Sequence, residues 1–219
     1  MDNTVGSRRN LTSEERAVVI GSILGDGCLE RRSSKSVRLK IGHGLQQKKY
    51  LAWKHQLLQG LVTTKRPVFV RGAVHPKNGK RYNRVESRTY STQIFAPFLN
   101  MFYVGNRKQV PQNIPQILTD PLSLAVWFMD DGYKRNDCAA FRLNTDSFSL
   151  EEQKLLRECL SQNFSINASI HAKGRYYNLY FPRNEAEKLR NIIERYVIPS
   201  MRYKISLDPV TTRSAHKAQ

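Results

Sequence analysis

A short apolar pattern that ends in Asp-Gly occurs twice in this chain. The copies span Val19–Gly27 and Leu124–Gly132, so that Asp26 and Asp131 take the same place in each. A single Asp-Gly pair is ordinary turn chemistry. Two copies that close apolar runs of the same length instead predict an internal duplication, in which each half contributes one aspartate to a shared site.

Both apolar runs carry the signals of helix ends. Thr12-Ser-Glu-Glu15 is typical of a capping box, and Asp120-Pro121 supplies a capping residue followed by proline at the first helical position. Gly27 and Gly132 are typical helix stops. Each aspartate is therefore predicted at the C-terminal end of a buried helix.

A carboxylate at the C-terminal end of a helix is unfavourable on its own. The helix dipole places negative potential there and disfavours an anion by roughly 0.3–1 kcal/mol. Two such anions are explained if a cation collects them, and hard oxygen ligands suit Mg²⁺ or Ca²⁺ better than zinc. The predicted metal ligands are the carboxylates of Asp26 and Asp131 together with the free carbonyls of the helix-end residues Gly25 and Asp130.

The charge of the chain is strongly positive and unevenly distributed. The net charge is +18 over 219 residues, and the pI is about 10.1. Between Arg31 and Lys108 there are 18 Lys or Arg residues and a single acid, Glu86. A solvated basic surface usually contains interspersed acids, so this bias favours a polyanionic partner.

Several classes of protein are excluded by what the sequence lacks. No apolar stretch reaches the ~18–20 residues that a membrane span needs, and Met1–Asn10 does not resemble a secretory signal. The cysteines Cys28, Cys138 and Cys159 are odd in number and widely spaced, which supports neither disulfides nor a zinc site and favours a reducing compartment. The histidines, at positions 43, 55, 75, 171 and 216, show no metal-ligand spacing.

Hydrophobic periodicity predicts the same order of elements in both halves. Residues 28–36 are expected to form a turn rich in small and basic residues. In the first half we expect helices near 13–24, 46–61 and 94–103, and strands near 37–41, 66–75 and 81–93. In the second half we expect helices near 121–131, 149–162 and 185–196, and strands near 141–145, 165–172 and 175–181.

The repeated order predicts an α+β fold made of two αββαββα halves related by a pseudo-twofold axis, and the segments above mark three of the four strands of each half. The expected boundaries are a flexible basic N-terminus at 1–12, a first half at 13–107, a linker at 108–120, a second half at 121–207 and a tail at 208–219. The two motif helices should pack against each other. Gly21 and Gly25 allow a close approach, whereas Val126 and Asp130 at the matching positions make the contact asymmetric.

Two antiparallel sheets with basic and polar open faces suit a DNA duplex better than a single strand. Val37–Ile41 is aligned with Phe141–Thr145, which makes Arg38 and Lys40 counterparts of Arg142 and Asn144. The candidate DNA-binding residues, for phosphates or base edges, are Arg38, Lys40, Lys77, Lys80, Arg81, Arg84, Arg88, Lys134, Arg135, Arg142, Asn144, Lys173, Arg175 and Asn178.

The two motifs resemble those of the LAGLIDADG homing endonucleases, in the single-chain form with two motifs. Phe128-Met-Asp-Asp-Gly132 is specific to this family, and two further segments match it: Asn106-Arg-Lys-Gln-Val-Pro111 and Ile198-Pro-Ser-Met-Arg-Tyr-Lys204. The resemblance implies that Lys108 and Lys204 lie beside the metal site.

The same resemblance implies the activity and its setting. It implies Mg²⁺-dependent cleavage of double-stranded DNA at a long asymmetric target, with 3′ overhangs, by a monomer. We expect Mn²⁺ to substitute for Mg²⁺, and Ca²⁺ to support binding without cleavage. We further expect an intron-encoded protein of an organelle or of a prokaryotic cytoplasm, which is not secreted.

Three alternatives remain open at this stage. A maturase of the same fold would bind intron RNA, and a DNA-binding regulator would keep the fold without cleavage. Either would more readily lose one aspartate or lysine, and the chain keeps Asp26, Asp131, Lys108 and Lys204. A nuclease of the D…ExK kind would use Glu152-Gln-Lys154, but this triplet is expected on the outside of a helix.

Overall fold

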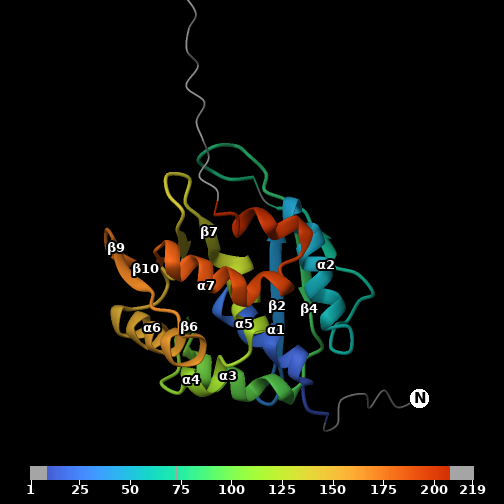
Figure 1. The fold of residues 1–219 in the computed structure, drawn as a ribbon. Helices are drawn as coiled ribbons and strands as arrows, with labels where there is room; N and C mark the ends of the chain where they lie inside the picture. Colours follow the sequence, from blue (N-terminus) through green and yellow to red (C-terminus); the bar gives the residue numbers. More distant parts are fainter. Residues whose placement is uncertain (1–8, 73, 208–219) are drawn as a thin grey trace, which may run out of the picture.

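The computed structural model describes residues 9–72 and 74–207, and its elements follow the predicted order (Figure 1). Most of the N-terminal segment 1–12 and the whole tail 208–219 lie outside the described residues. The elements of the first half are α1 (Ser13–Leu24), β1 (Gly27–Arg31), β2 (Val37–Gly44), the 3-10 helix η1 (Leu45–Gln47), α2 (Lys48–Leu57), β3 (Val68–Val70), β4 (Arg84–Arg88), the 3-10 helix η2 (Gln93–Phe95) and α3 (Ala96–Phe102).

The second half repeats this order and confirms the α+β fold of two αββαββα halves. Its elements are α5 (Pro121–Asp131), β7 (Gly132–Lys134), β8 (Phe141–Leu143), α6 (Leu150–Phe164), β9 (Ser169–Lys173), β10 (Tyr176–Phe181), α7 (Arg183–Ile193) and the 3-10 helices η3 (Glu194–Tyr196) and η4 (Pro199–Lys204). None of the helices within the described ranges is long and apolar enough to cross a membrane.

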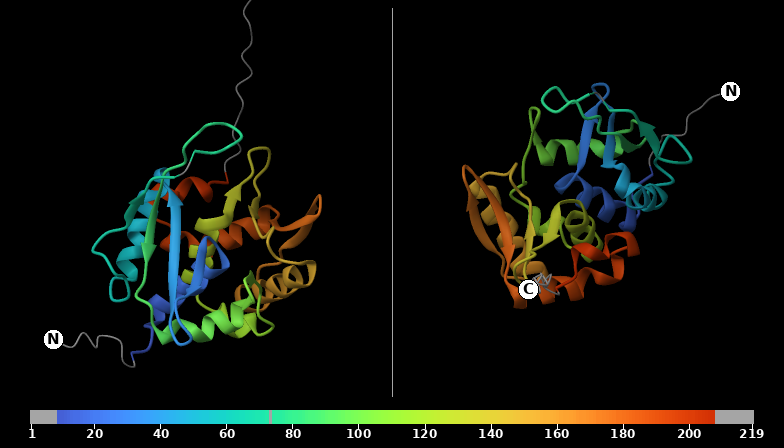
Figure 2. Two further views of the ribbon diagram at one scale, coloured as in Figure 1. Left: turned by 180° about the vertical axis from the view of Figure 1, so that it is seen from behind. Right: turned by 90° about the horizontal axis from the view of Figure 1, so that it is seen from above.

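Each half contains one antiparallel four-stranded sheet of the same topology. The strand order is β1-β2-β4-β3 in the first sheet and β7-β8-β10-β9 in the second. Figure 2 shows the sheets on opposite sides of the central helices. The turn expected at 28–36 is wrong in its first part, because residues 28–31 belong to β1, which pairs with β2. The strands expected at 66–75 and 81–93 are shorter, since β3 and β4 occupy only their central parts.

The segment between the halves is folded. Strands β5 (Tyr103–Val104) and β6 (Arg107–Lys108) form a small hairpin. A short helix, α4 (Ile114–Ile117), follows and contacts α6. The proline content of this segment favoured a plain linker, but Ile114 and Ile117 are buried in the common core. This hairpin positions Lys108.

The register of the sheets corrects the alignment of the two halves. Gly27 lies opposite Ile41, and Gly132 lies opposite Leu143. Because the two glycines are matched positions, Ile41 matches Leu143. The predicted alignment of Val37–Ile41 with Phe141–Thr145 is therefore wrong by two residues, since Ile41 follows Gly27 by 14 positions whereas Leu143 follows Gly132 by only 11. Lys40 thus corresponds to Arg142 rather than to Asn144.

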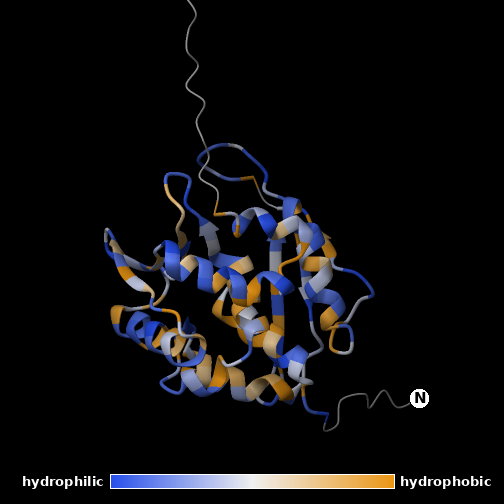
Figure 3. Ribbon diagram, in the orientation of Figure 1, coloured by the Kyte–Doolittle hydropathy of each residue, from blue (hydrophilic) through white to orange (hydrophobic). Residues whose placement is uncertain are grey.

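Helices α1 and α5 form the centre of the molecule, where hydrophobic residues concentrate (Figure 3). A Cβ atom at Gly21 would lie 2.4 Å from the carbonyl oxygen of Ser123, and one at Gly25 would lie 2.5 Å from the Cβ of Asp130. Both distances are too short for any side chain. The close, asymmetric packing predicted from these glycines is confirmed.

The helix starts match the sequence signals, and one stop does not. Thr12 and Glu15 form the capping box of α1, and the Asp120 side chain accepts from the backbone N–H of Leu122 at the start of α5. Gly132 ends α5 as expected. The stop expected at Gly27 is wrong, because α1 ends at Leu24 and Gly25 is its cap. Asp26 therefore lies in the turn between α1 and β1.

Candidate active site

The two motif aspartates come from neighbouring positions at the seam between the halves. Asp131 is the last residue of α5, and Asp26 follows the cap of α1. The two helices make the most extensive contact between elements of the molecule. The side chain of Asp26 is 41% exposed, and Asp131 is partly buried. Each carboxylate therefore retains access to a ligand from outside.

Two lysines, one beside each motif helix, donate hydrogen bonds to backbone carbonyls at the ends of these helices. Lys108 donates to the carbonyl oxygens of Gly25 and Gly27, with Nζ–O distances of 2.8 and 3.0 Å. Lys204 donates to the carbonyl oxygens of Met129 and Asp130, at 2.6 and 2.9 Å. Burial lowers the pKa of both lysines, against the effect of the nearby aspartates. The structure thus brings Lys108 and Lys204 to the two aspartates.

The carbonyl oxygens of Gly25 and Asp130 were predicted as metal ligands, and each accepts a lysine hydrogen bond here. A carbonyl oxygen has two lone pairs, so one lysine does not exhaust it. The carboxylates of Asp26 and Asp131 with these two carbonyls give an oxygen donor set that fits a hard divalent cation.

The Asp130 carboxylate is bound by groups of the first half. Oδ1 accepts from Tyr50 Oη and Lys54 Nζ, each at 2.8 Å, and Oδ2 accepts from the backbone N–H of Asp26 at 3.1 Å. Lys54 and the Asp130 side chain have no exposed area. Burial, followed by the charge of Asp130, raises the pKa of Tyr50, so the phenol keeps its proton and donates. This ion pair fixes Asp130 as a tie between the halves.

His43 is a site residue that the sequence analysis missed. Its Nδ1 lies 3.2 Å from Asp26 Oδ2, and its Nε2 lies 3.7 Å from Asp130 Oδ1. Ligand atoms of Asp26, His43 and Asp130 all lie within 4.8 Å of one another, so these residues form a second possible metal group. The alternation of buried residues along β2 continues from Ile41 to His43. That alternation was the available signal.

The ion pair of Asp130 weighs against a cation in this second group. The Asp130 oxygen nearest His43 already carries the Lys54 ammonium at 2.8 Å, and a divalent cation there would meet a buried positive charge. Asp26 and Asp131 are free of such a close ion pair with a lysine among the described residues. Within the described residues, the ion pair thus leaves Asp26 and Asp131, rather than Asp130, with carboxylates that no lysine neutralises at close range.

The two motif aspartates differ in their affinity for protons. Burial raises the pKa of Asp131, and the charges of Asp26 and Asp130 raise it further, to about 7. Burial also opposes ionisation of Asp26, but the contact with His43 and the charges of Lys54 and Lys204 hold its pKa below the ordinary value. The register makes Thr145 the counterpart of His43. Asp131 therefore has no imidazole in the matching place.

The open face of the first sheet carries the predicted cations together with two acids. Arg38 and Lys40 on β2 both bind Glu30 on β1, with contacts of 2.6 Å. Arg84 and Arg88 on β4 both bind Glu86 between them. The remaining candidates Lys77, Lys80 and Arg81 are exposed in the segment between β3 and β4. The structure thus places all seven first-half candidates on or beside the open face.

The open face of the second sheet is less charged. Arg142 lies opposite Tyr180, and its guanidinium lies over the Tyr180 ring. Asn144, Lys173 and Arg175 are exposed, as predicted for DNA-binding residues. Lys173 approaches Asp146 at 3.7 Å.

Three second-half candidates for DNA binding are buried, turned to the other face of the sheet or bound to an acid. Asn178 is 1% exposed, and neither amide atom has a hydrogen-bond partner among the described residues. It points to the open face but is covered there, because bulky neighbours flank it. Lys134 lies opposite Phe141, a core residue, so it projects toward the helix-covered face. Arg135 is bound to Asp137.

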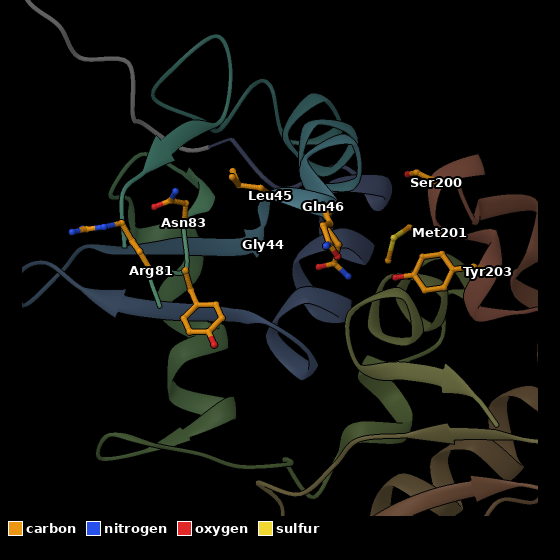
Figure 4. Close-up of a pocket in the computed structure, with 10 residues that line it drawn as sticks. Gly44, Leu45, Gln46, Arg81, Asn83, Ser200, Met201 and Tyr203 are labelled. Atoms are coloured by element: carbon orange, nitrogen blue, oxygen red, sulfur yellow. The ribbon is translucent and has the colours of Figure 1, made fainter. Parts of the chain in front are cut away.

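An open hollow adjoins the site at the seam between the halves (Figure 4). The first half lines it with residues 44–47 and 81–83, and the second half with Ser200, Met201 and Tyr203. Gly44 follows His43 directly and Tyr203 precedes Lys204. The described residues that line this hollow include no carboxylate, so they offer no acidic ligand for a cation.

The alternative D…ExK site is not supported. Glu152 forms the capping box of α6 with Ser149, and its Oε1 accepts from the backbone N–H of Val110 at 3.1 Å. Lys154 pairs with Glu151 on the surface of the same helix. The triplet was expected on the outside of the helix, but Glu152 and Gln153 are buried and only Lys154 is exposed. Glu152 and Lys154 both have structural partners.

The comparisons with known proteins agree with this geometry. Residues 16–189 match the LAGLIDADG DNA endonuclease family. The chain is 29% identical over 206 residues to the cytochrome b mRNA maturase bI2 of Debaryomyces hansenii, covering 93% of this chain and 78% of the relative. It is 27% identical to the DNA endonuclease I-ChuI of Chlamydomonas applanata, covering 90% and 96%. The chain spans about half the length of some other curated relatives.

A solved structure has the same fold. The homing endonuclease I-WcaI bound to its DNA recognition sequence superposes with a TM-score of 0.84 at 24% identity, covering 92% of this chain and 89% of that one. The fold and the paired motifs define a single-chain scaffold with two pseudo-symmetric halves. The chain belongs to the LAGLIDADG DNA endonuclease family.

Proposed function

We propose that this protein is a site-specific endonuclease that cuts both strands of a long, asymmetric DNA target and leaves short 3′ overhangs. The observation that carries the proposal is the pair of aspartates at the seam, each beside a lysine that holds the adjacent helix-end carbonyl. Two aspartates provide for two cuts, and two different sheets provide for an asymmetric target. We also propose that the protein acts as a monomer and is intron-encoded.

The chemistry assigns separate roles to the aspartates and the lysines. Asp26 and Asp131 would hold divalent ions, with Mg²⁺ as the proposed cofactor and Mn²⁺ as a substitute. A bound ion supplies an activated water and stabilises the leaving oxygen of the phosphodiester. Lys108 and Lys204 keep the helix ends in place, and their ammonium groups offset the negative charge that develops on the phosphate.

The cationic first half supports the choice of DNA as partner. Many of its exposed Lys and Arg residues, among them Lys77, Lys80 and Arg84, lie on the open face of the sheet or on the segment beside it, where they would meet a phosphate backbone. The relative I-WcaI binds DNA on the same fold. We therefore place the duplex across the open faces of both sheets, with the seam beneath the cleaved phosphates.

A maturase function is the second candidate, because one relative is an mRNA maturase. Such a function needs the folded surface but not the paired aspartates. The presence of Asp26, Asp131, Lys108 and Lys204 together favours cleavage. Both activities are compatible in one chain if RNA binds outside the cleaved duplex.

Cleavage of a randomised duplex library by purified protein tests the proposal. With Mg²⁺, sequencing of the cut ends should give one long consensus with paired, staggered cuts. Ca²⁺ should support binding without cuts, because it takes more ligands at longer distances than Mg²⁺. The double variant Asp26→Asn/Asp131→Asn is the control for contaminating nucleases. Selective binding of intron RNA without any cut DNA would favour the maturase.

A further inference from the structure

The single acid of the cationic stretch, Glu86, lies at the centre of the open face of the first sheet. It is the middle residue of β4, and Arg84 and Arg88 flank it on the same face. Although it points to the open side, it is only 2% exposed. The two arginines cover it. An acid on a DNA-facing surface repels phosphates, so its presence there needs a reason.

The contacts of Glu86 divide its carboxylate between the two arginines. Oε1 accepts from Nε of Arg84 at 2.7 Å, and Oε2 accepts from Nε of Arg88 at 3.1 Å and from its Nη2. Both arginine side chains remain about half exposed, at 53% and 46%. Arg84 is therefore held only at the base of its guanidinium, whereas Arg88 is held along one side of it.

The free ends of the two arginines are not equivalent. Among the described residues, Arg84 uses only Nε in hydrogen bonds, so both of its terminal nitrogens are available. Arg88 also uses Nη2, which leaves Nη1. A guanidinium with two parallel terminal N–H groups matches O6 and N7 of guanine in the major groove. Arg84 thus presents the geometry for reading a G·C pair.

We propose that Glu86 is a specificity-determining positioning residue, which holds Arg84 and Arg88 extended toward the major groove of the bound duplex. A free arginine has about 2 kcal/mol of rotamer entropy to lose on binding and reaches neighbouring phosphates as easily as a base. The carboxylate removes that freedom before the duplex arrives. This inference rests on the proposed binding of duplex DNA, and it concerns selectivity rather than cleavage.

The second half supports the proposal by contrast. Ile41 lies opposite Ser87 and Leu143 lies opposite Leu179, so the register makes Asn178 the counterpart of Glu86. Tyr176 and Tyr180 then stand where Arg84 and Arg88 stand in the first half. No arginine is present at these two places, and the acid between them is absent as well.

The test measures binding of metal-free protein, in EDTA, to duplexes with each base pair of the target varied in turn. Glu86→Gln keeps the shape and removes the charge. It should reduce the preference at one or two adjacent base pairs roughly tenfold, the order of one bidentate contact. Arg84→Lys should lose preference at the same position. Affinity for scrambled duplexes should stay equal or rise, because a negative charge is removed.

Glu151→Gln is the matched control, because Glu151 is exposed on α6 and pairs with Lys154 on the same helix. It changes the net charge by the same amount and should leave base preference intact. The proposal is overturned if Glu86→Gln keeps the wild-type base preference. It is also overturned if Glu86→Gln loses base preference evenly along the target, because an even loss would reflect the change of charge and not the positioning of the arginines.

Two further outcomes, a variant that does not fold and a wild type without sequence preference, also decide between the proposals. If Glu86→Gln does not fold, Arg84→Lys and Arg88→Lys carry the test with the acid in place, and wild-type preference in both overturns the proposal. If the wild-type protein prefers no duplex sequence, the proposed function fails together with the inference. A selective wild type with an unchanged Glu86→Gln defeats the inference alone.

Discussion

The two halves share a fold and differ in the residues on the open faces of their sheets. The open-face residues of β4 are Arg84, Glu86 and Arg88, and the matching residues of β10 are Tyr176, Asn178 and Tyr180. The sheet order is identical. The buried residues thus maintain the same topology in both halves, whereas the residues on the open faces of the two sheets differ. A protein built this way is suited to a target whose two half-sites differ.

The same contrast reaches the active site. Helix α1 has Gly25 where α5 has Asp130, and the space left by the glycine is filled by the Asp130 side chain. That carboxylate turns into the first half, where Lys54 neutralises it. Asp26 then has His43 and a backbone N–H bonded to Asp130, and Asp131 has neither. The two aspartates share a motif but not an environment.

The largest expected effect is the loss of cleavage when either motif aspartate is neutralised. Asp26→Asn or Asp131→Asn should abolish double-strand cleavage and leave duplex binding in EDTA within a few-fold of wild type. The reason is that each carboxylate is assigned as a metal ligand, and the aspartate of the other half cannot take its place. Asp137→Asn, an exposed carboxylate paired with Arg135, is the control. A single variant that cuts both strands at the wild-type rate would remove that aspartate from the site.

The tie between the halves should dominate stability. Lys54→Met leaves the buried Asp130 carboxylate without its cation and should lower the free energy of unfolding by about 3–5 kcal/mol. Urea denaturation measures this change. Lys49→Met, on the exposed side of the same helix, should change stability by less than about 0.5 kcal/mol. Equal stabilities of the two variants would show that Asp130 is satisfied by Tyr50 and the backbone alone.

The lysines at the helix ends should act on rate rather than on affinity. Lys108→Met and Lys204→Met should each slow single-turnover cleavage roughly 10²-fold, as loss of an electrostatic group at a reacting phosphate does. Lys188→Met, on the surface of α7, is the control. Comparison of the two rates tests symmetry, since each lysine binds one carbonyl at a matched position, that of Gly25 or Asp130. Rates within a few-fold of wild type would exclude the lysine concerned.

The unequal aspartates predict a pH dependence of metal-free stability. In the folded protein Asp131 has a pKa of about 7, against the ordinary 3.8. Between these pH values the unfolded state loses its proton first, so the free energy of unfolding falls as pH rises from about 4 to about 7. Asp131→Asn should remove this decline, on the order of 2 kcal/mol once partial exposure is allowed for. Identical pH profiles for wild type and variant would contradict the assignment.

The smallest effects concern affinity, and they should separate the two sheets. Replacing Lys77 and Lys80 with Met should weaken binding to all sequences alike. It should also reduce the magnitude of the slope of log K against log salt concentration by about one or two. Replacing Arg142 and Asn144 with Ala should change which base pairs are tolerated. Titrations across salt on cognate and scrambled duplexes measure both. Altered base preference with an unchanged slope in the lysine variants would reverse this division.

The sequence predicted the features that depend on local pattern. Helix starts at Thr12 and Asp120 followed from capping chemistry, and the close packing of Gly21 and Gly25 followed from residue size. The repeated order of elements followed from hydrophobic periodicity. The lysines Lys108 and Lys204 came from the family resemblance, and the structure brings both to the helix ends.

What the sequence could not predict depends on contacts between distant residues. His43 reaches Asp26 only because β2 pairs with β1 in a particular register, and no ligand spacing marks it. The same register is invisible to motif comparison, which misaligned Asn144 with Lys40. Asn178 has the right face for DNA, yet its burial depends on neighbouring strands. The partnership of Lys54 with Asp130 joins two halves and leaves no local trace.

We propose that the paired aspartates at the seam jointly hold the catalytic metal. Anomalous diffraction from Mn²⁺ in crystals of the protein with its duplex target tests this assignment most directly. We expect manganese against the carboxylates of both Asp26 and Asp131, next to the cleaved phosphates. Manganese confined to the group of Asp26, His43 and Asp130, with Asp131 unliganded, would contradict it.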